Sequence, residues 1–468
     1  LLDLSRVLLV EDPEAPVVSL GRSDAPPAAT LLAAAETGWG ISTIDGQVQL
    51  PVWALNWIAD LAGAGLEQGA VTVDPFERTP ATENPLVASG LTRRPVVQEA
   101  ARELRAAIGT AAGQRPAYFL PPWPDGHRWA AAISHDVDVI DWWPAFTGLR
   151  LVELLSRGKI GLAARVIAAA IASSFGDPVW QGLDAIMRIE AELGIRSTWF
   201  ILTGTPTFAT MTRGDLTYLP EGRRASRLLS TLAASGHEIG LHGSFATMMS
   251  REKLSGERER LAKLVDHSVS GVRQHYLRFR PGRTQVEMRA AGFSYDASYG
   301  FADRNGFRLG VADIVPAFDA SSNRQSGAPP IDEVPLHWMD RALSKYSGIE
   351  RPAAWVDDGL ELAATCRKLE GLFVALWHPN LVPALGYPDA LPQLRRLLES
   401  LLADRPWIRP LGEIARWRAA RRSVRATGVN GDGSPRLTGS FESFGSLRLE
   451  SADGGELRTV AAPGSARG

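Results

Sequence analysis

The chain has 468 residues, of which 45% are hydrophobic and 22% are charged, and its formal net charge is −2. This balance is typical of a folded protein and gives no electrostatic reason to expect a nucleic-acid partner. The single cysteine, Cys366, excludes an intramolecular disulfide and a cysteine-based zinc cage.

Neither a signal peptide nor a membrane span is expected. The most apolar stretch, residues 160–175, contains Arg165 and falls short of the roughly 20 residues that cross a bilayer. We interpret it as a buried or amphipathic helix, and we expect a cytoplasmic protein.

Three regions follow one another along the chain. Residues 1–125 combine short apolar runs, turn-forming pairs and one strong helical pattern at 94–108, which predicts an accessory α/β region. Residues 126–424 have a regular alternating pattern. Residues 425–468 are rich in Gly, Ser and Asp, and they predict either a small β appendage or a disordered tail.

The regular region alternates strand-like and helix-like segments, which predicts an α/β fold with parallel strands covered by helices. Its short apolar runs lie at 129–133, 197–202, 238–241, 276–279, 334–336 and 372–377. Helical patterns lie at 181–193, 223–235, 251–266, 286–291, 356–369, 391–403 and 413–422. Polar clusters follow most of the apolar runs, at the strand ends that carry the active site in barrels of this class.

Two carboxylates end the first apolar run of this region. In Ser134-His135-Asp136-Val137-Asp138 they are two positions apart, and alternate residues of a strand face the same side. Asp136 and Asp138 are therefore expected to point together, where their repulsion favours a raised pKa or a bound cation. The alternative is a pair of solvated residues at a strand end.

Three histidines near other apolar runs are further candidates. His242 follows 238–241, and a neutral imidazole paired with a carboxylate is a good ligand for zinc. His275 is either a ligand or an ordinary hydrogen-bonded side chain, and the nearby Arg278 and Arg280 either anchor a carboxylate or face water. His378 follows 372–377 and either donates a proton or caps a turn.

The other histidines are weaker candidates. His237 precedes its strand, so we expect a structural role at the opposite end of the sheet. His337 ends another apolar run and is a candidate substrate contact, whereas His127 and His267 are expected at the surface.

Taken in order, these clusters resemble the polysaccharide deacetylase family, the carbohydrate esterases with a NodB homology domain. The resemblance covers residues 128–420 and implies a distorted (β/α) barrel. In that family the first carboxylate of the pair is the base and the second binds metal, which implies these roles for Asp136 and Asp138. By the same resemblance, His242 after Gly236-His237-Glu238-Ile239-Gly240 would bind the metal, and His378 would be the general acid.

One position departs from the family pattern. A second metal-binding histidine usually stands four residues after the first, but position 246 is alanine, which cannot bind a metal. We propose His275 as the replacement ligand. Either Arg278 or Arg280 could take the place of the family's arginine beside the base.

The resemblance implies a metal-dependent hydrolase that removes an N-acetyl or similar acyl group from an amino sugar or polysaccharide. The expected cofactor is a divalent metal ion, zinc, with cobalt or nickel as alternatives. Candidate substrate contacts are Trp199, Tyr276, His337 and Trp377, and Trp142, Trp143 and Trp338 could also stack on sugar rings. The alternative function is a catalytically inactive barrel that binds saccharides or assembles with a partner.

Overall fold

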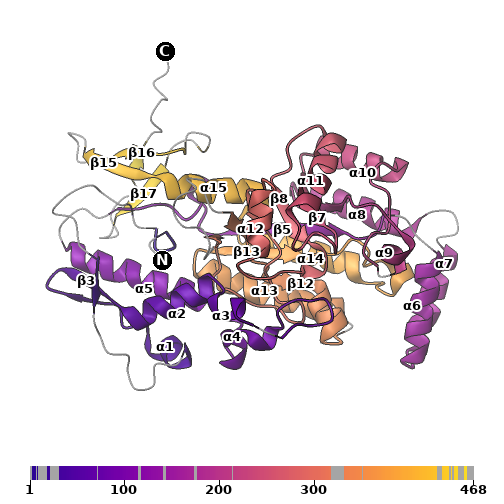
Figure 1. The fold of residues 1–468 in the computed structure, drawn as a ribbon, viewed down its shortest axis with the longest axis horizontal. Helices are drawn as coiled ribbons and strands as arrows, with labels where there is room; N and C mark the ends of the chain where they lie inside the picture. The colour runs from indigo at the N-terminus through magenta and orange to yellow at the C-terminus, as the bar shows by residue number, and fades with distance from the viewer. Residues whose placement is uncertain are drawn as a thin grey trace, which may run out of the picture.

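A computed structural model describes most of the chain. The described residues are 3–6, 8, 18–21, 31–70, 72–113, 118–140, 144–172, 177–212, 214–317, 331–349, 351–429, 435–441, 444, 447–451 and 458–460. A curled sheet of mainly parallel strands forms a half-barrel, and helices surround it (Figure 1). The α/β barrel class expected from the sequence is confirmed.

The strand order of the main sheet is β10-β11-β9-β8-β7-β6-β5-β13-β12, and β14 also pairs with β5. Its pairings are parallel except the one between β10 and β11. All residues of β5, β6 and β13 are buried, as expected for parallel strands that are covered on both faces. The strands are β5 (Ala130–Val137), β6 (Thr198–Leu202), β7 (Glu238–Gly243), β8 (Gly271–Gln274), β9 (Tyr295–Asp296), β10 (Val315–Pro316), β11 (Asp332–Glu333), β12 (Trp338–Met339), β13 (Leu372–Leu376) and β14 (Trp407–Ile408).

The predicted helices of this region are present, and local signals explain their ends. The Asp177 carboxylate accepts hydrogen bonds from the amides of Val179 and Trp180 at the start of α8, a typical N-cap. Gly236 has a φ of 72° and follows α10, where a left-handed residue ends the helix. The helices are α8 (Pro178–Glu192), α9 (Phe208–Thr212), α10 (Arg223–Ala234), α11 (Arg251–Val265), α12 (Thr284–Ala290), α13 (Pro352–Lys368), α14 (Ala390–Ala403) and α15 (Leu411–Ser423).

Two of the predicted strands are wrong. Residues 276–279 follow β8 in a short turn, in which Tyr276 and Leu277 have positive φ angles of 60° and 51° that no strand allows. Residues 334–336 lie between β11 and β12, and Pro335 has no N–H to donate to a strand ladder.

The N-terminal region packs against the barrel. Its hydrophobic cluster includes barrel residues such as Phe279, Tyr299 and Val311. The predicted helix at 94–108 is α5 (Val96–Ala112). The other elements are β1 (Val18–Gly21), α1 (Leu31–Thr37), β2 (Ser42–Ile44), β3 (Gln47–Pro51), α2 (Val52–Ala62), α3 (Gly65–Gln68) and α4 (Pro85–Ala88).

The C-terminal region is a β appendage in its described part. β15 (Arg425–Val429) pairs with β16 (Pro435–Thr438), and β17 (Leu447–Ser451) pairs with β18 (Arg458–Val460). β17 also pairs with β4 (Tyr118–Phe119), so the N-terminal region and the appendage share one sheet. The division at 125 and 425 stays a prediction.

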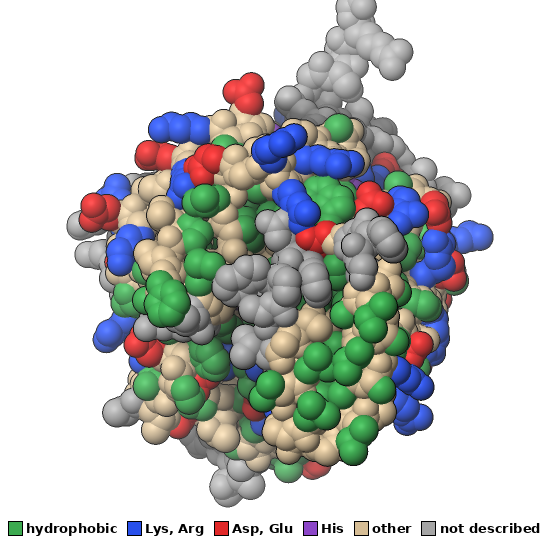
Figure 2. Space-filling model, turned by 90° about the vertical axis from the view of Figure 1, so that its right-hand side faces the viewer, with side chains coloured by type: hydrophobic (Ala, Val, Ile, Leu, Met, Phe, Trp, Pro, Cys, Tyr) green, Lys and Arg blue, Asp and Glu red, His purple; other side chains and the backbone are tan. Residues whose placement is uncertain are grey.

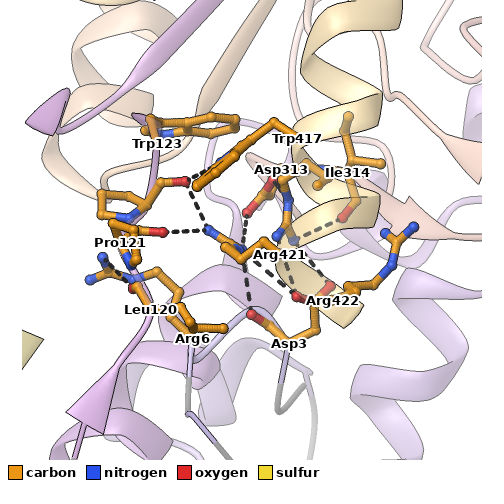
Figure 3. A network of polar contacts seen from close by, with 12 residues as sticks. Asp3, Arg6, Leu120, Pro121, Trp123, Asp313, Ile314, Trp417, Arg421 and Arg422 are labelled. Atoms are coloured by element: carbon orange, nitrogen blue, oxygen red, sulfur yellow. Dashed lines mark hydrogen bonds and ion pairs between the residues drawn. The ribbon is translucent and has the colours of Figure 1, made fainter. Parts of the chain in front are cut away.

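Buried ion pairs attach the first residues to the last helix of the barrel (Figure 3). Arg418 on α15 lies 2.6 Å from Asp313 and 3.1 Å from Asp3, and its side chain is fully buried. Arg421 donates to the carbonyl of Pro122 at 2.9 Å and lies 3.5 Å from Asp313. Segments far apart in the sequence therefore depend on one another for charge neutralisation.

A helical hairpin of α6 (Pro144–Ser156) and α7 (Ile160–Ala172) projects from one end of the molecule (Figure 1). α7 buries Ala163 and Val166 but leaves Ile160 and Ile171 exposed. Figure 2 looks onto this end, where hydrophobic side chains reach the surface. Among the described residues, every helix lacks the length and hydrophobicity needed to cross a bilayer.

Candidate active site

Five predicted side chains converge at the carboxyl ends of the parallel strands. Asp136 is the next-to-last residue of β5 and Asp138 follows the strand, His242 is on β7, His275 follows β8, and His378 follows β13. All five line one cavity of about 1000 Å³. The sheet brings them together because parallel strands present all their carboxyl ends at the same edge.

Asp138, His242 and His275 form a cluster that could hold a metal ion. One ligand atom from each lies within 4.8 Å of the others. Nε2 of His242 is 3.4 Å from Oδ1 of Asp138, and Nε2 of His275 is 3.5 Å from the same oxygen. Within the described part of the chain, the Asp138 Oδ1 and His242 Nε2 atoms are buried without a hydrogen-bond partner. Buried polar atoms left in this way fit a cation, and two imidazoles with a carboxylate are ligands that zinc accepts.

The other ring nitrogen of each histidine fixes the orientation of the cluster. Nδ1 of His242 donates to the carbonyl of Arg273 at 2.9 Å, and Nδ1 of His275 lies 3.0 Å from the Asp215 carboxylate. Such partners leave Nε2 as the free ligand atom and hold the ring in place. His275 therefore presents Nε2 toward Asp138 and His242, so it could serve as the third ligand of this cluster.

Asp136 is suited to act as a base. Arg273 Nη1 donates to Asp136 Oδ1 at 2.9 Å, and the arginine side chain is completely buried. Burial alone would raise the pKa of Asp136, but the charge of Arg273, followed by those of His242 and His378, lowers it below its usual value. The carboxylate is ionised as a result.

The arginine expected at this place was therefore misassigned. Arg278 donates to the carbonyl of Phe76 at 2.9 Å and pairs with Glu77, and the backbone amide of Arg280 donates to Thr284. The sequence interpretation placed the strand at 276–279, whereas β8 is Gly271–Gln274. Val269 and Val272 around Gly271 were the signal for the true strand, because β-branched residues favour strands.

His378 is held on the other side of Asp138. Its Nε2 lies 4.0 Å from Asp138 Oδ2, and its Nδ1 lies 2.7 Å from the carboxylate of Asp340. Burial alone would lower the pKa of His378, but the Asp340 carboxylate outweighs burial and raises it. Asp340 was not predicted, although it follows β12, the neighbour of β13 in the sheet.

The N-terminal region reaches the turn that carries His275. The ring of Tyr276 stacks on His275 at 4.0 Å and on Phe76 at 4.8 Å between ring centroids. Arg78 donates to the carbonyl of Tyr276 at 2.7 Å. We call Phe76 and Arg78 the brace, because both contact Tyr276 in this turn.

Tyr276 lines the cavity as predicted, but three other candidate substrate contacts do not. Trp199 and Trp377 are buried in the core at 0% and 1% exposure. His337 uses both ring nitrogens, accepting from the amide of Val374 at 3.1 Å and donating to the carbonyl of Val311 at 3.2 Å. Each side chain points to the packed interior, although each stands near a strand end.

The remaining aromatic and histidine expectations have mixed outcomes. Trp338 is fully buried and donates to the carbonyl of Trp355, so it is also a core residue. Trp142 and Trp143 lie outside the described residues. His237 accepts from the amide of Ser197 at 3.1 Å, before β7, as expected for a structural histidine. His127 and His267 bond to backbone carbonyls away from the cavity.

Several solved structures are similar to this chain. A protein from Mycobacterium smegmatis assigned as a polysaccharide deacetylase is 19% identical, with 66% of this chain and 96% of that chain covered and a TM-score of 0.42. A probable polysaccharide deacetylase from Pseudomonas aeruginosa PAO1 is 15% identical, with 65% and 95% covered and a TM-score of 0.42. A CE4 family pseudoenzyme from Bacillus anthracis is 10% identical, with 61% and 65% covered and a TM-score of 0.30.

In fold, the chain is similar to polysaccharide deacetylases. No protein-family model and no curated protein matches the chain. At these identities the inference of function depends on the side chains of the site itself.

Proposed function

We propose that this protein is a metal-dependent hydrolase that removes an acetyl or similar acyl group from the nitrogen of an amino sugar. The observation that supports it is the placement of Asp138, His242 and His275 around one point, with an ionised Asp136 beside them and His378 opposite. These are the parts that hydrolysis of an amide by an activated water needs.

A divalent cation would be held by Asp138, His242 and His275, with zinc favoured by the nitrogen and oxygen ligand set and cobalt or nickel as alternatives. When bound, such an ion lowers the pKa of water and stabilises the oxyanion of the tetrahedral intermediate. Asp136, kept ionised by Arg273, accepts the proton of the attacking water. His378, whose pKa is raised by Asp340, donates a proton to the departing amine.

The alternative function, an inactive saccharide-binding barrel, arises from the alanine at position 246. The position of His275 argues against that alternative, because its Nε2 lies close enough to Asp138 and His242 to bind the same metal ion. The cavity itself would suit either function.

Substitution of the two carboxylates separates the roles. Asp136→Asn should reduce acetate release from acetylated amino sugars by at least about 10²-fold, because general-base catalysis is lost. Its metal content, measured by elemental analysis, should stay near that of the wild type. Asp138→Asn should lose both metal and activity.

Three results would count against the proposal. Full activity of Asp136→Asn would show that the base is another group. Metal retained in Asp138→Asn would show that the ion lies elsewhere. A wild-type protein that binds saccharides without metal and without acetate release would support the inactive barrel.

A further inference from the structure

More cationic than anionic side chains line the cavity, although the chain as a whole has a net charge of −2. The carboxylates in its lining are Asp136, Asp138, Glu153 and Asp389. The positive side chains outnumber them and include Arg150, Arg157, Arg165, Arg341 and Arg351. A concave surface lined with one sign of charge concentrates ligands of the opposite sign.

Arg341 is the most constrained of these cations. It follows β12 and Asp340, and it donates to the hydroxyl of Tyr387 at 2.8 Å and to Oδ1 of Asn380 at 2.7 Å. Both partners are neutral. In the part of the chain that the structure describes, Arg341 has no carboxylate within ion-pair distance. Burial would lower the pKa of Arg341, but Tyr387, Asp340 and Asp138 raise it, so its charge is balanced only from a distance while its planar fork is held in a fixed direction.

Arg150 completes the same subsite from the helical hairpin. The guanidinium carbons of Arg150 and Arg341 each lie 5.4 Å from the ring centroid of Tyr387. Arg150 pairs with Glu153 through Nη1, but within the described chain its Nε is buried without a hydrogen-bond partner. A buried, unused guanidinium N–H costs free energy unless a ligand accepts from it.

The subsite lies on the side of the cavity where the leaving group would depart. Asp340, which holds His378, directly precedes Arg341, and Asn380 is two residues after His378. A group bound by Arg341 and Arg150 would therefore be attached to the amino sugar itself or to its neighbour.

We propose that Arg341 and Arg150 bind an anionic group, a phosphate or a carboxylate, carried by the saccharide next to the acyl group. Two guanidiniums beside the same tyrosine ring suit such a group, because arginine forks match both anions in a bidentate way. This inference rests on the proposed function for its reaction, but the anion site can be tested without it.

The first test measures binding alone. Titration calorimetry of the whole protein with glucose 1-phosphate, glucuronate and glucose should give binding to at least one anionic sugar that is at least about tenfold tighter than to glucose. The tighter of the two anions identifies phosphate or carboxylate as the group. Arg341→Gln should remove most of this difference, and Arg341→Lys, which keeps the charge without the fork, should remove part of it.

The control is Arg188→Gln. Arg188 is on α8, pairs with Asp184 and does not line the cavity, so the same charge is removed elsewhere. Binding in this variant should equal that of the wild type. Equal binding of all three sugars by the wild type would overturn the inference, as would an Arg341→Gln variant that binds the anion as tightly.

The second test measures the reaction. The anionic substrates are N-acetylglucosamine 1-phosphate and a disaccharide of N-acetylglucosamine and N-acetylmuramic acid, and the neutral one is N,N′-diacetylchitobiose. In the wild type, kcat/KM for an anionic substrate should be about ten times that for the neutral one. In Arg341→Gln the two values should become nearly equal. Acetate release with no anion preference overturns the anion site and leaves the hydrolase. Anion binding that depends on Arg341 without any acetate release supports the site and contradicts the proposed reaction.

Discussion

The two sides of the candidate site are held by different parts of the molecule. On one side, His378 follows β13 and is fixed by Asp340 after the adjacent β12, so the barrel sheet alone positions both groups. On the other side, His275 lies in a turn with a left-handed Tyr276, and the brace from residues 76 and 78 packs on that turn.

This difference indicates what holds a candidate ligand in place at different positions of the barrel. A side chain on a strand end is placed by sheet register and needs little else. A ligand that follows a strand in a turn needs contacts from outside the sheet to hold its backbone. The N-terminal region supplies these contacts through Phe76 and Arg78, so it belongs to the site as well as to the fold.

The largest effect is expected from His275→Ala. Loss of one of three protein ligands should weaken zinc affinity by more than about 100-fold, a larger change than loss of a supporting partner gives. Zinc affinity can be measured by competition with a chelator of known affinity. His267→Ala, which removes an exposed histidine at the end of α11, should bind zinc as the wild type does. Unchanged zinc affinity in His275→Ala would exclude it as a ligand.

Asp340→Asn should affect only the side of the candidate site that contains His378. The neutral amide no longer raises the pKa of His378, so kcat should fall by about 10²-fold, within the range for general acid catalysis. Zinc content and KM should stay close to the wild-type values, because Asp340 lies outside the metal cluster. A parallel loss of zinc would show that the two sides are not independent.

Phe76→Ala should give a smaller change on the metal side. Removal of the ring that stacks on Tyr276 loosens the turn of His275, and a supporting contact of this kind is expected to change metal affinity by about tenfold. The control is Phe208→Ala, since the Phe208 side chain is 84% exposed. If the two variants bind zinc equally well, the brace does not position His275.

His337 offers a contrast with the site histidines, and its effect should be on stability alone. Burial lowers its pKa from 6.5 to about 3. Between pH 6.5 and pH 3, His337 is therefore protonated in the unfolded chain but neutral in the folded protein. As a result, the free energy of unfolding should fall by about 1.4 kcal/mol per pH unit as the pH drops from 6 toward 4.

Urea unfolding at several pH values would measure this slope. His337→Gln, which cannot titrate, should be less stable at pH 7 but should show a flatter slope than the wild type. If His337→Gln and the wild type lose stability in parallel, another group carries the acid sensitivity.

The sequence was sufficient to predict side chains at or just beyond the carboxyl ends of apolar strands. Asp136 and His242 are the next-to-last residues of β5 and β7, Asp138 and His378 come after β5 and β13, and parallel strand ends must meet at one edge. It was not sufficient for Arg273 or Asp340, because their partners are set by the register between strands. An error in the position of β8 moved the expected arginine to Arg278.

The same limit explains the wrong substrate contacts. Trp199 lies near the amino end of β6, His337 precedes β12 and Trp377 follows β13, and all three side chains are buried in the core. The alternation of residues along a strand predicts two faces, but it does not predict which of them lines the cavity. Only the packing of helices on the sheet decides that.

The ion pairs between Asp3 and α15 bear on how this protein can be shortened. A version cut to residues 126–424 would lack the Asp3 carboxylate, leaving Asp313 as the described carboxylate in contact with both Arg418 and Arg421. Stranding a buried charge costs about 3–5 kcal/mol, a large share of the stability of a typical domain. The barrel is therefore expected to be less stable when expressed alone, and a shortened version should keep the residues around Asp3 attached.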